Sequence, residues 1–400
     1  MTLHEPAVMP TYGRFPLTLV RGAGTRVWDD SGREFLDVAG ALGVTAIGHS
    51  HPAWVEAITT QAATLDMVSN LYATEPQAHL ADRLAALLPI PDAQVFFANS
   101  GAEANEAAIK LARKHGLASG RPTIVALEGS FHGRTVAALA ATGSPAKREP
   151  FEPLMDWFRF VPPGDLGALE AAMTPDVGAV LIEPVMGEGG VLPLPDEYLR
   201  GVRAACDDRG VMLIADEVQS GMGRCGDWLA ISRSGVVPDA VSLAKALGGG
   251  LPIGALVARA DLAFGSGEHA STFGGGPIVC AGALAVLDVI ETQGLLPRAD
   301  AIGDLLSRTV REAADEAPVT DVRVKDVRGR GCLWGIQLER PVAHEVALAM
   351  LDAGVLVSIA GPDVVRMSPP LVATDDDIRH AVATFVDALR RVAQTQGSPV

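Results

Sequence analysis

Short apolar runs recur between about Gln94 and Ala258, and each is closed by glycine, proline or an acidic residue. Runs of this length without polar alternation are typical of strands buried on both faces of a sheet. Helix-like segments, such as Glu103–His115 and Asp196–Arg209, separate several of them. Buried strands that alternate with helices predict an α/β fold with a mostly parallel sheet. The predicted strands are Val95–Ala98, Thr123–Leu127, Ala179–Ile182, Met212–Ala215, Ala240–Leu243 and Ala255–Ala258.

The sequence on either side of this region has a different pattern. Val20–Asp37 predicts short strands joined by turns. After about Thr292, helical periodicity from Ala299 to Ala317 leads into shorter apolar segments. We therefore expect a smaller C-terminal α+β domain, which the N-terminal strands could join. Its further predicted elements are strands at Val322–Val324 and within Gly329–Leu338, and helices at Val342–Ala353 and Asp375–Val392.

The composition and net charge of the chain limit the kinds of molecule that it is expected to bind. The chain has 400 residues, 48% of them hydrophobic and 20% charged, which fits a two-domain globular enzyme. Acidic residues outnumber basic ones by 48 to 32, for a formal charge of −16. Such a surface repels phosphate backbones and anionic membranes, so we expect neither a nucleic-acid nor a membrane partner.

The cysteines and the first residues bear on compartment and metal binding. Cys206, Cys225, Cys280 and Cys332 are widely spaced and form no CxxC pair. We interpret them as apolar fillers in a reducing compartment, and we expect neither a disulfide framework nor a metal site. Met1–Arg14 lacks the pattern of a signal peptide, and no apolar stretch is long enough to span a bilayer. The expected location is the cytoplasm.

Three segments place reactive side chains where predicted strands end. Ser100 and Glu103 have the spacing of a capping box at a helix start, which explains the helix without any function but also suits a phosphate. Asp216 directly follows five apolar residues, so it is either a turn residue or a buried carboxylate that needs a cation. Lys245 lies among small residues before three glycines; it either extends to solvent or has a lowered pKa suited to a Schiff base.

Together these three segments match the needs of one cofactor. A phosphate cradle, a strand-end aspartate and a strand-end lysine are what pyridoxal 5′-phosphate requires. The phosphate would anchor the ring, Asp216 would keep the ring nitrogen protonated, and Lys245 would bind the aldehyde carbon.

Nearly the whole chain resembles the class III (subgroup II) aminotransferases of the fold type I pyridoxal-phosphate superfamily, and within them most closely the acetylornithine aminotransferases. The blocks that carry the resemblance are Pro10–Arg14, Gly48–Pro52, Asn70–Tyr72, Ser100–Glu106, Phe131–Thr135, Glu183–Gly190, Asp216–Gln219, Ala244–Gly248 and Ser271–Gly275. The fold implied has a large cofactor-binding domain at 51–292, with a mostly parallel central sheet. The small α+β domain would combine the N-terminal segment 1–50 with the C-terminal residues 293–400.

The resemblance also implies a role for each matching residue around the cofactor. Lys245 and Asp216 would be catalytic. Val218 and Phe131 would lie on opposite faces of the ring, and Gln219 would reach its phenolic oxygen. In this family the threonine at the position of Thr272 comes from the partner subunit, which implies a homodimer with shared active sites. The implied cofactor-binding set is Ser100, Gly101, Ala102, Phe131, Asp216, Val218, Gln219, Lys245 and Thr272.

Substrate recognition would depend on two arginines, whose planar guanidinium groups suit carboxylates. The resemblance assigns Arg134 to the α-carboxylate of an acylated amino acid. It assigns Arg366 to the second carboxylate of glutamate or 2-oxoglutarate, with Glu188 pairing with Arg366 when glutamate is absent. The implied substrate-binding set is Arg134, Arg366, Glu188, Glu183 and Ser271.

The expected reaction is transamination of N2-acetyl-L-ornithine with 2-oxoglutarate, in arginine biosynthesis. Leu42 stands where ornithine aminotransferases carry tyrosine, which favours an acylated substrate. The alternatives are N-succinylornithine, N-succinyl-diaminopimelate, ornithine or 4-aminobutyrate as the amine donor, an aminomutase, or a non-catalytic cofactor-binding protein. We interpret His49, His51 and His132 as structural. Two positions depart from the family pattern: Ala102 replaces a threonine, and Gly276 replaces an asparagine.

Overall fold

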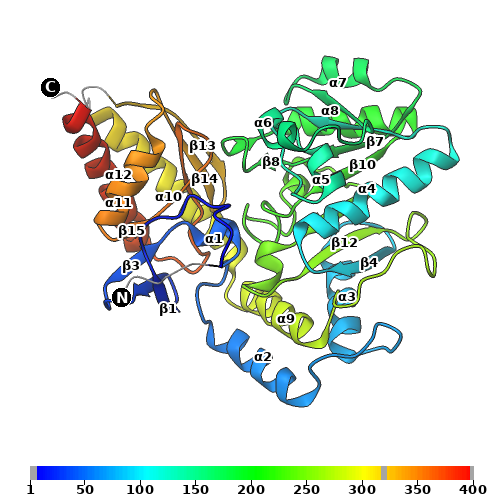
Figure 1. Cartoon of the computed structure of the whole chain (residues 1–400), viewed down its shortest axis with the longest axis horizontal. Coiled ribbons are helices and arrows are strands. Elements are labelled where there is room, and N and C mark those ends of the chain that lie inside the picture. Colours follow the sequence, from blue (N-terminus) through cyan, green and yellow to red (C-terminus); the bar gives the residue numbers. More distant parts are fainter. Residues whose placement is uncertain (1–6, 317–321, 397–400) are drawn as a thin grey trace.

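The computed structural model describes residues 7–316 and 322–396 and has two lobes (Figure 1). The larger lobe contains a seven-stranded sheet with the order β4-β12-β11-β10-β7-β5-β6. Only β12 runs against the other strands, because it pairs antiparallel with both of its neighbours. The prediction of a mostly parallel sheet is therefore confirmed. The strands are β4 (Ala93–Ala98), β5 (Thr123–Leu127), β6 (Phe158–Val161), β7 (Val177–Ile182), β10 (Met212–Asp216), β11 (Ala240–Leu243) and β12 (Gly254–Arg259).

The continuous apolar runs follow from burial on both faces of this sheet. In β10, Met212 and Ile214 pack in one apolar cluster, whereas Leu213 and Ala215 pack in another. Helix α4 (Gly101–Ala118) contributes to the first cluster, and α8 (Asp196–Arg209) and α9 (Pro277–Thr292) contribute to the second. The remaining helices of this lobe are α2 (Pro52–Thr64), α3 (Glu75–Leu87), α5 (Val136–Ala141), α6 (Pro145–Arg148) and α7 (Leu166–Ala172).

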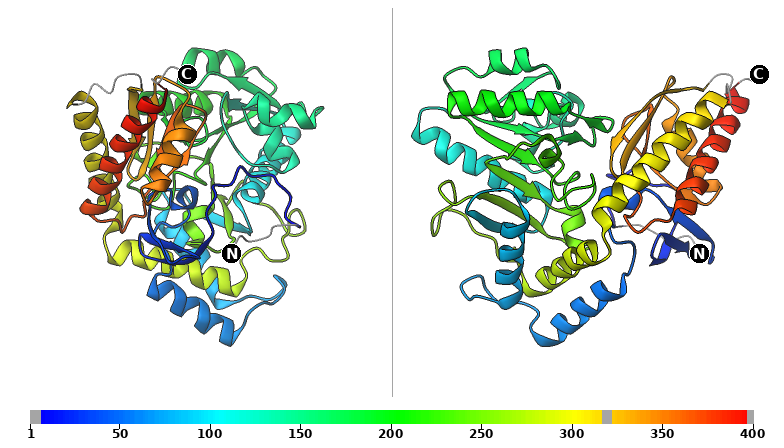
Figure 2. Two further views of the ribbon diagram at one scale, coloured as in Figure 1. Left: turned by 60° about the vertical axis from the view of Figure 1, so that its left-hand side comes forward. Right: turned by 180° about the vertical axis from the view of Figure 1, so that it is seen from behind.

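The other lobe combines both ends of the chain (Figure 2). Strands β1 (Leu19–Ala23), β2 (Arg26–Asp29) and β3 (Glu34–Asp37) form a sheet with β15 (Val355–Leu356), which lies parallel to β3. A second sheet has the order β13-β14-β17-β16, with β13 (Val324–Arg330), β14 (Leu333–Leu338), β16 (Ser358–Ile359) and β17 (Val364–Met367). The helices here are α10 (Leu295–Glu316), α11 (Ala343–Asp352) and α12 (Asp375–Gln396). The domain limits at 50 and 292 stay a prediction.

The predicted elements differ from the structure in several places, and one predicted helix end falls outside the described residues. The strand predicted at Val322–Val324 is wrong, since Val322 and Arg323 precede β13. Strand β6 was not predicted, because Arg159 interrupts its apolar run. A charged residue is tolerated there because β6 is an edge strand with only one neighbour. The predicted helix end at Ala317 lies outside the described residues.

Within the described part of the chain, no single helix is long and apolar enough to span a membrane. Helices α9 and α10 together have the length and apolar composition of a membrane span, but the chain bends by 69° between them. All four cysteines are buried and free.

Candidate active site

A cavity of about 470 Å³ opens where the strands that run parallel reach their carboxyl ends. Ligands bind at this edge in open α/β sheets, because the loops after the strands converge there. Asp216 ends β10, and Lys245 follows β11 by two residues. The residues that line the cavity are Val44, Asn99, Ser100, Gly101, Ala102, Asn105, Phe131, His132, Gly133, Arg134, Glu183, Glu188, Asp216, Val218, Gln219, Ala244, Lys245, Gly250, Leu251, Pro252 and Ile253.

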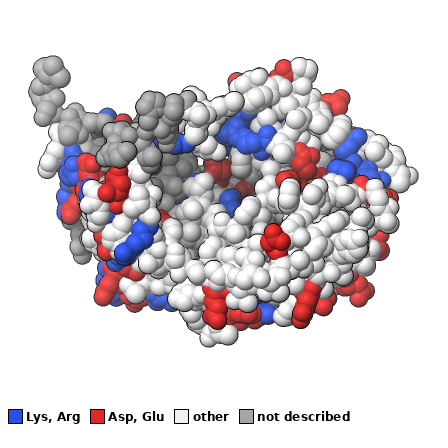
Figure 3. Space-filling view, turned by 60° about the horizontal axis from the view of Figure 1, so that its bottom comes forward, with Lys and Arg blue, Asp and Glu red and all other residues white. Residues whose placement is uncertain are grey.

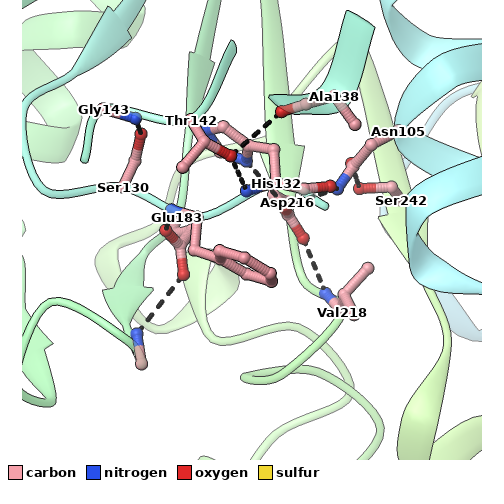
Figure 4. Close-up of polar contacts among 12 residues, drawn as sticks. Asn105, Ser130, His132, Ala138, Thr142, Gly143, Glu183, Asp216, Val218 and Ser242 are labelled. Carbon is pink, nitrogen blue, oxygen red and sulfur yellow. Dashed lines mark hydrogen bonds and ion pairs between the residues drawn. The ribbon is translucent and has the colours of Figure 1, made fainter. Parts of the chain in front are cut away.

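The carboxylate of Asp216 is buried at the floor of this cavity and accepts three hydrogen bonds (Figure 4). Its Oδ2 accepts from Nδ1 of His132 and Nδ2 of Asn105, each at 2.7 Å, and its Oδ1 accepts from the amide of Val218 at 3.0 Å. Ser242 donates in turn to Oδ1 of Asn105, which fixes the orientation of that amide. Burial acts against a charged imidazole, but Asp216 outweighs it and raises the pKa of His132. These donors hold an anion in the interior.

Lys245 also lines the cavity and begins the 3₁₀ turn η3 (Lys245–Gly248). Its φ of 44° is in the left-handed region, which disfavours residues with a side chain. Such strain persists at sites where the surroundings enforce one geometry. Burial lowers the pKa of Lys245, although Asp216 and Glu183 partly offset this effect. A lowered pKa makes the unprotonated, nucleophilic amine more accessible at neutral pH.

The third predicted segment starts helix α4. Ser100 caps the helix, since its Oγ accepts from the amide of Glu103 at 3.2 Å. The carboxylate of Glu103 accepts from the amide of Asn99 at 2.8 Å, so the reciprocal contact of a capping box is displaced by one residue. The amides of Gly101 and Ala102 have no acceptor within the helix and border the cavity. A Cβ on Gly101 would lie 2.6 Å from Cγ1 of Val218, so only glycine allows this close packing.

Glu183 links the segment that carries Phe131 to the loop that carries Glu188. Its carboxylate accepts from the amide of Phe131 at 2.7 Å and from the amide of Gly187 at 3.3 Å. Burial raises the pKa of Glu183 to about 7. The guanidinium carbon of Arg134 lies 5.6 Å from the centre of the Phe131 ring.

Arg366, on β17, is almost fully buried. Its Nη1 donates to Oε1 of Glu188 at 2.7 Å and to the carbonyl of Gly187 at 3.1 Å, and its Nε donates to Oγ of Ser358 at 3.0 Å. Arg366 is not itself a lining residue, whereas its partner Glu188 is. A ligand carboxylate at this guanidinium would therefore compete with Glu188.

Besides Arg366, two predicted residues do not line the cavity of the single chain. Thr272 is exposed, and its proposed role in the site of a second subunit stays a prediction. Ser271 lies nearby, where its Oγ accepts from Nδ2 of Asn99 at 3.2 Å.

Sequence reasoning did not single out Asn105, Val44 or the Gly250–Ile253 loop, all of which border the cavity. For Asn105 a signal existed, because it lies one helical turn after Gly101 on the same helix face.

Comparison with known proteins identifies the chain. A family model for class III aminotransferases matches residues 7–389. The chain belongs to the class III aminotransferases. It is 48% identical to the acetylornithine aminotransferase of Methanopyrus kandleri over 385 residues, which are 96% of each protein. It is 47% identical to the acetylornithine aminotransferase of Mycolicibacterium smegmatis over 394 residues, which cover 98% of this chain and 97% of that protein.

Solved structures agree with this assignment. The N-acetylornithine aminotransferase of Stenotrophomonas maltophilia K279a has a TM-score of 0.82 at 35% identity, covering 95% of this chain and 97% of that one. An ornithine aminotransferase from Toxoplasma gondii, in which the cofactor partly occupies the active site, has a TM-score of 0.93 at 30% identity, covering 98% of this chain and 94% of that one. The predicted class, fold type and enzyme activity are therefore confirmed.

The cofactor of this aminotransferase is pyridoxal 5′-phosphate, and the cavity fits it. Free amides at the start of α4 suit the phosphate, and the buried carboxylate of Asp216 suits a protonated ring nitrogen. The buried amine of Lys245 suits the aldehyde carbon.

Proposed function

We propose that this aminotransferase moves the δ-amino group of N2-acetyl-L-ornithine to 2-oxoglutarate, giving N-acetyl-L-glutamate 5-semialdehyde and L-glutamate. The names of the relatives at 48% and 47% identity support acetylornithine as the amine donor. We propose that the enzyme serves arginine biosynthesis and acts in the cytoplasm. Leu42, on the short helix α1 (Gly40–Gly43), does not line the cavity; its neighbour Val44 does.

We propose the following roles around the cofactor. The amides of Gly101 and Ala102, beside Ser100, hold the phosphate. Asp216 holds the proton on the ring nitrogen, and Asn105 and His132 keep this carboxylate in place by donating to it. Val218 and Phe131 enclose the ring from its two faces, and Gln219 reaches its phenolic oxygen. Once bound, the cofactor supplies an electron sink for the carbon that loses its proton.

Lys245 moves the proton. Burial lowers the pKa of its Nζ, which favours the neutral amine that can accept a proton. With the cofactor bound, this amine would take the proton from the carbon that carries the substrate amino group. The histidines are not needed for this step, and His132 acts through Asp216.

The two arginines separate the two substrates. Arg134 lies open in the cavity and binds the α-carboxylate of acetylornithine, whereas Arg366 is covered by Glu188. Glutamate and 2-oxoglutarate carry a second carboxylate, which replaces Glu188 on Arg366. The ion pair between Arg366 and Glu188 is the single observation that best supports one site for two unlike substrates. Glu183 and Ser271 complete the proposed substrate set through their contacts with Phe131 and Asn99.

We further propose a homodimer in which Thr272 completes the phosphate site of the other subunit. Two loops carry exposed apolar side chains: Leu71 and Tyr72 are 89% and 70% exposed, and Phe273 is 65% exposed. The side chain of Asn70 joins these loops by donating to the carbonyls of Ser271 and Gly274. The face seen in Figure 3 has a broad area free of charged residues. Exposed apolar surface of this kind favours association with a second copy.

A steady-state assay with several amine donors tests the proposed substrate. Acetylornithine with 2-oxoglutarate should give the highest kcat/KM, above succinylornithine, succinyl-diaminopimelate, ornithine and 4-aminobutyrate. A higher value for any of these would replace the proposed substrate. Turnover without 2-oxoglutarate would indicate an aminomutase. A protein that binds the cofactor but turns over none of these donors would be non-catalytic.

A further inference from the structure

The carboxylate of Glu188 lies between two cations. Its Oε1 is 2.7 Å from Nη1 of Arg366, and its Oε2 is 3.6 Å from Nζ of Lys147. Lys147 belongs to α6 and Arg366 to β17, so the two cations come from opposite lobes. Each carboxylate oxygen thus faces its own positive charge.

The two cations differ in burial. The Arg366 side chain is 2% exposed, whereas those of Lys147 and Glu188 are 26% and 28% exposed. The Nζ atom of Lys147 also lies 4.7 Å from the centre of the Phe131 ring, a cation–π contact that holds the ammonium at the cavity wall. The more buried pair is the stronger one, because less water screens it. The observed arrangement therefore favours Arg366 as the first partner of Glu188.

A dicarboxylate at Arg366 leaves Glu188 in need of another partner. Burial raises the pKa of Glu188, but Arg366, Lys147 and Lys245 together outweigh this effect and lower it. The group therefore stays ionised at neutral pH. Moving a half-buried carboxylate away from its cation is unfavourable unless a second cation receives it. Lys147 is already beside Oε2, so a small rotation of the Glu188 side chain is enough.

We propose that Lys147 is a specificity-determining residue that receives Glu188 whenever the second carboxylate of a five-carbon dicarboxylate occupies Arg366. This proposal rests on the proposed function. Lys147 stabilises the open arrangement more than the closed one, and so strengthens dicarboxylate binding without touching the ligand. The amine donor carries one carboxylate and leaves Glu188 paired with Arg366. Its binding therefore does not depend on Lys147.

The test uses the holoenzyme and glutarate, an unreactive five-carbon dicarboxylate, with binding followed by calorimetric titration. The substitution Lys147→Met keeps the side-chain length over Phe131 but removes the charge. A partly exposed ion pair is worth about fivefold in affinity, so glutarate should bind about fivefold more weakly. Lys147→Arg should stay within about twofold of wild type. The control Arg148→Met removes a neighbouring charge that lies over the Phe160 ring, and should also leave binding unchanged.

The same substitution in a Glu188→Gln background separates the proposed role from direct ligand binding. Without the Glu188 charge, Lys147→Met should change the glutarate affinity less than about twofold. An equal loss in both backgrounds would overturn the proposal, because Lys147 would then bind the ligand itself. An unchanged affinity in the single Lys147→Met variant would overturn it as well.

The acetylornithine half-reaction supplies the kinetic control. Its KM and single-turnover rate should be the same in Lys147→Met and wild type, while the KM for 2-oxoglutarate rises and kcat changes little. Wild-type protein that binds no glutarate would refute the proposed function and this inference with it. Wild-type binding that depends on Arg366 but not on Lys147 would refute this inference alone.

Discussion

The Nδ1 atom of His132 lies 2.7 Å from Oδ2 of Asp216, and both side chains are shielded from water. A carboxylate accepts hydrogen bonds, so Nδ1 of His132 donates in this contact. Burial disfavours a charged imidazole, but Asp216 outweighs it and raises the pKa of His132. The carboxylate also accepts from Asn105. These donors compensate the burial of the Asp216 carboxylate, which suits a protonated heterocycle as its partner.

Replacing Asp216 by Asn should reduce kcat by roughly a hundredfold or more, because the charge that keeps the ring nitrogen protonated is lost. The variant should still bind the cofactor, as measured from its absorbance. Near-normal turnover by a folded, cofactor-loaded variant would show that Asp216 does not hold the ring nitrogen.

Replacing Arg366 by Ala should slow the 2-oxoglutarate half-reaction by a factor equivalent to about 1.5–3 kcal/mol or more, because one substrate carboxylate loses its partner. The acetylornithine half-reaction should stay nearly normal, whereas Arg134→Ala should slow both. Stopped-flow spectra of each half-reaction measure this. Equal slowing of both half-reactions in Arg366→Ala would contradict the division between the two arginines.

Glu188→Ala should leave Arg366 open at all times. We expect tighter glutamate binding and weaker discrimination in favour of acetylornithine, because the carboxylate that covers the guanidinium at 2.7 Å is gone. The ratio of the two kcat/KM values measures this. A ratio equal to that of wild type would show that Glu188 does not control access to Arg366.

Subunits carrying Lys245→Ala and Thr272→Ala, each poorly active alone, should regain activity when mixed. If Thr272 serves the partner's site, each heterodimer has one site with both defects and one intact site. Activity should therefore rise with the fraction of heterodimer, measured after separation of the species by two affinity tags. Verified heterodimers without recovered activity would place Thr272 in the site of its own subunit.

Glu217 predicts a pH dependence of stability. Burial raises the pKa of this carboxyl to about 7 in the folded protein, so the folded state keeps its proton at a pH where the unfolded chain has lost it. Stability should therefore fall as pH rises from about 4.5 to about 7, by roughly 3 kcal/mol from this group.

The substitution Glu217→Gln should remove that part of the pH dependence. When the unfolding midpoints of variant and wild type are plotted against pH over this range, the two curves should converge or cross. The exposed Glu170→Gln serves as the control. Parallel curves for Glu217→Gln and wild type would show that Glu217 does not titrate as expected.

The sequence predicted the elements that are buried on both faces and missed what depends on contacts between distant segments. Strands β5 and β11 match the prediction at both ends, and no charged residue interrupts either of them. Strand β6 was missed because Arg159 breaks its run at the sheet edge.

Pairings across the site were beyond prediction from patterns alone. Asp216 was predicted as an anion that needs a partner, but its side-chain donors lie 84 and 111 residues away along the chain. No periodicity relates residues at such separations. The contact of Lys147 with Glu188 is of the same kind, since it depends on how a four-residue helix packs beside the cavity.

Lys245 is the centre of this account, and reductive labelling tests it most directly. The purified protein should be yellow, and borohydride should attach the cofactor irreversibly to one lysine. Peptide mapping by mass spectrometry should find the added mass on Lys245, and Lys245→Ala should bind the cofactor without becoming labelled or turning over. A label on any other lysine, or full labelling of Lys245→Ala, would contradict the account.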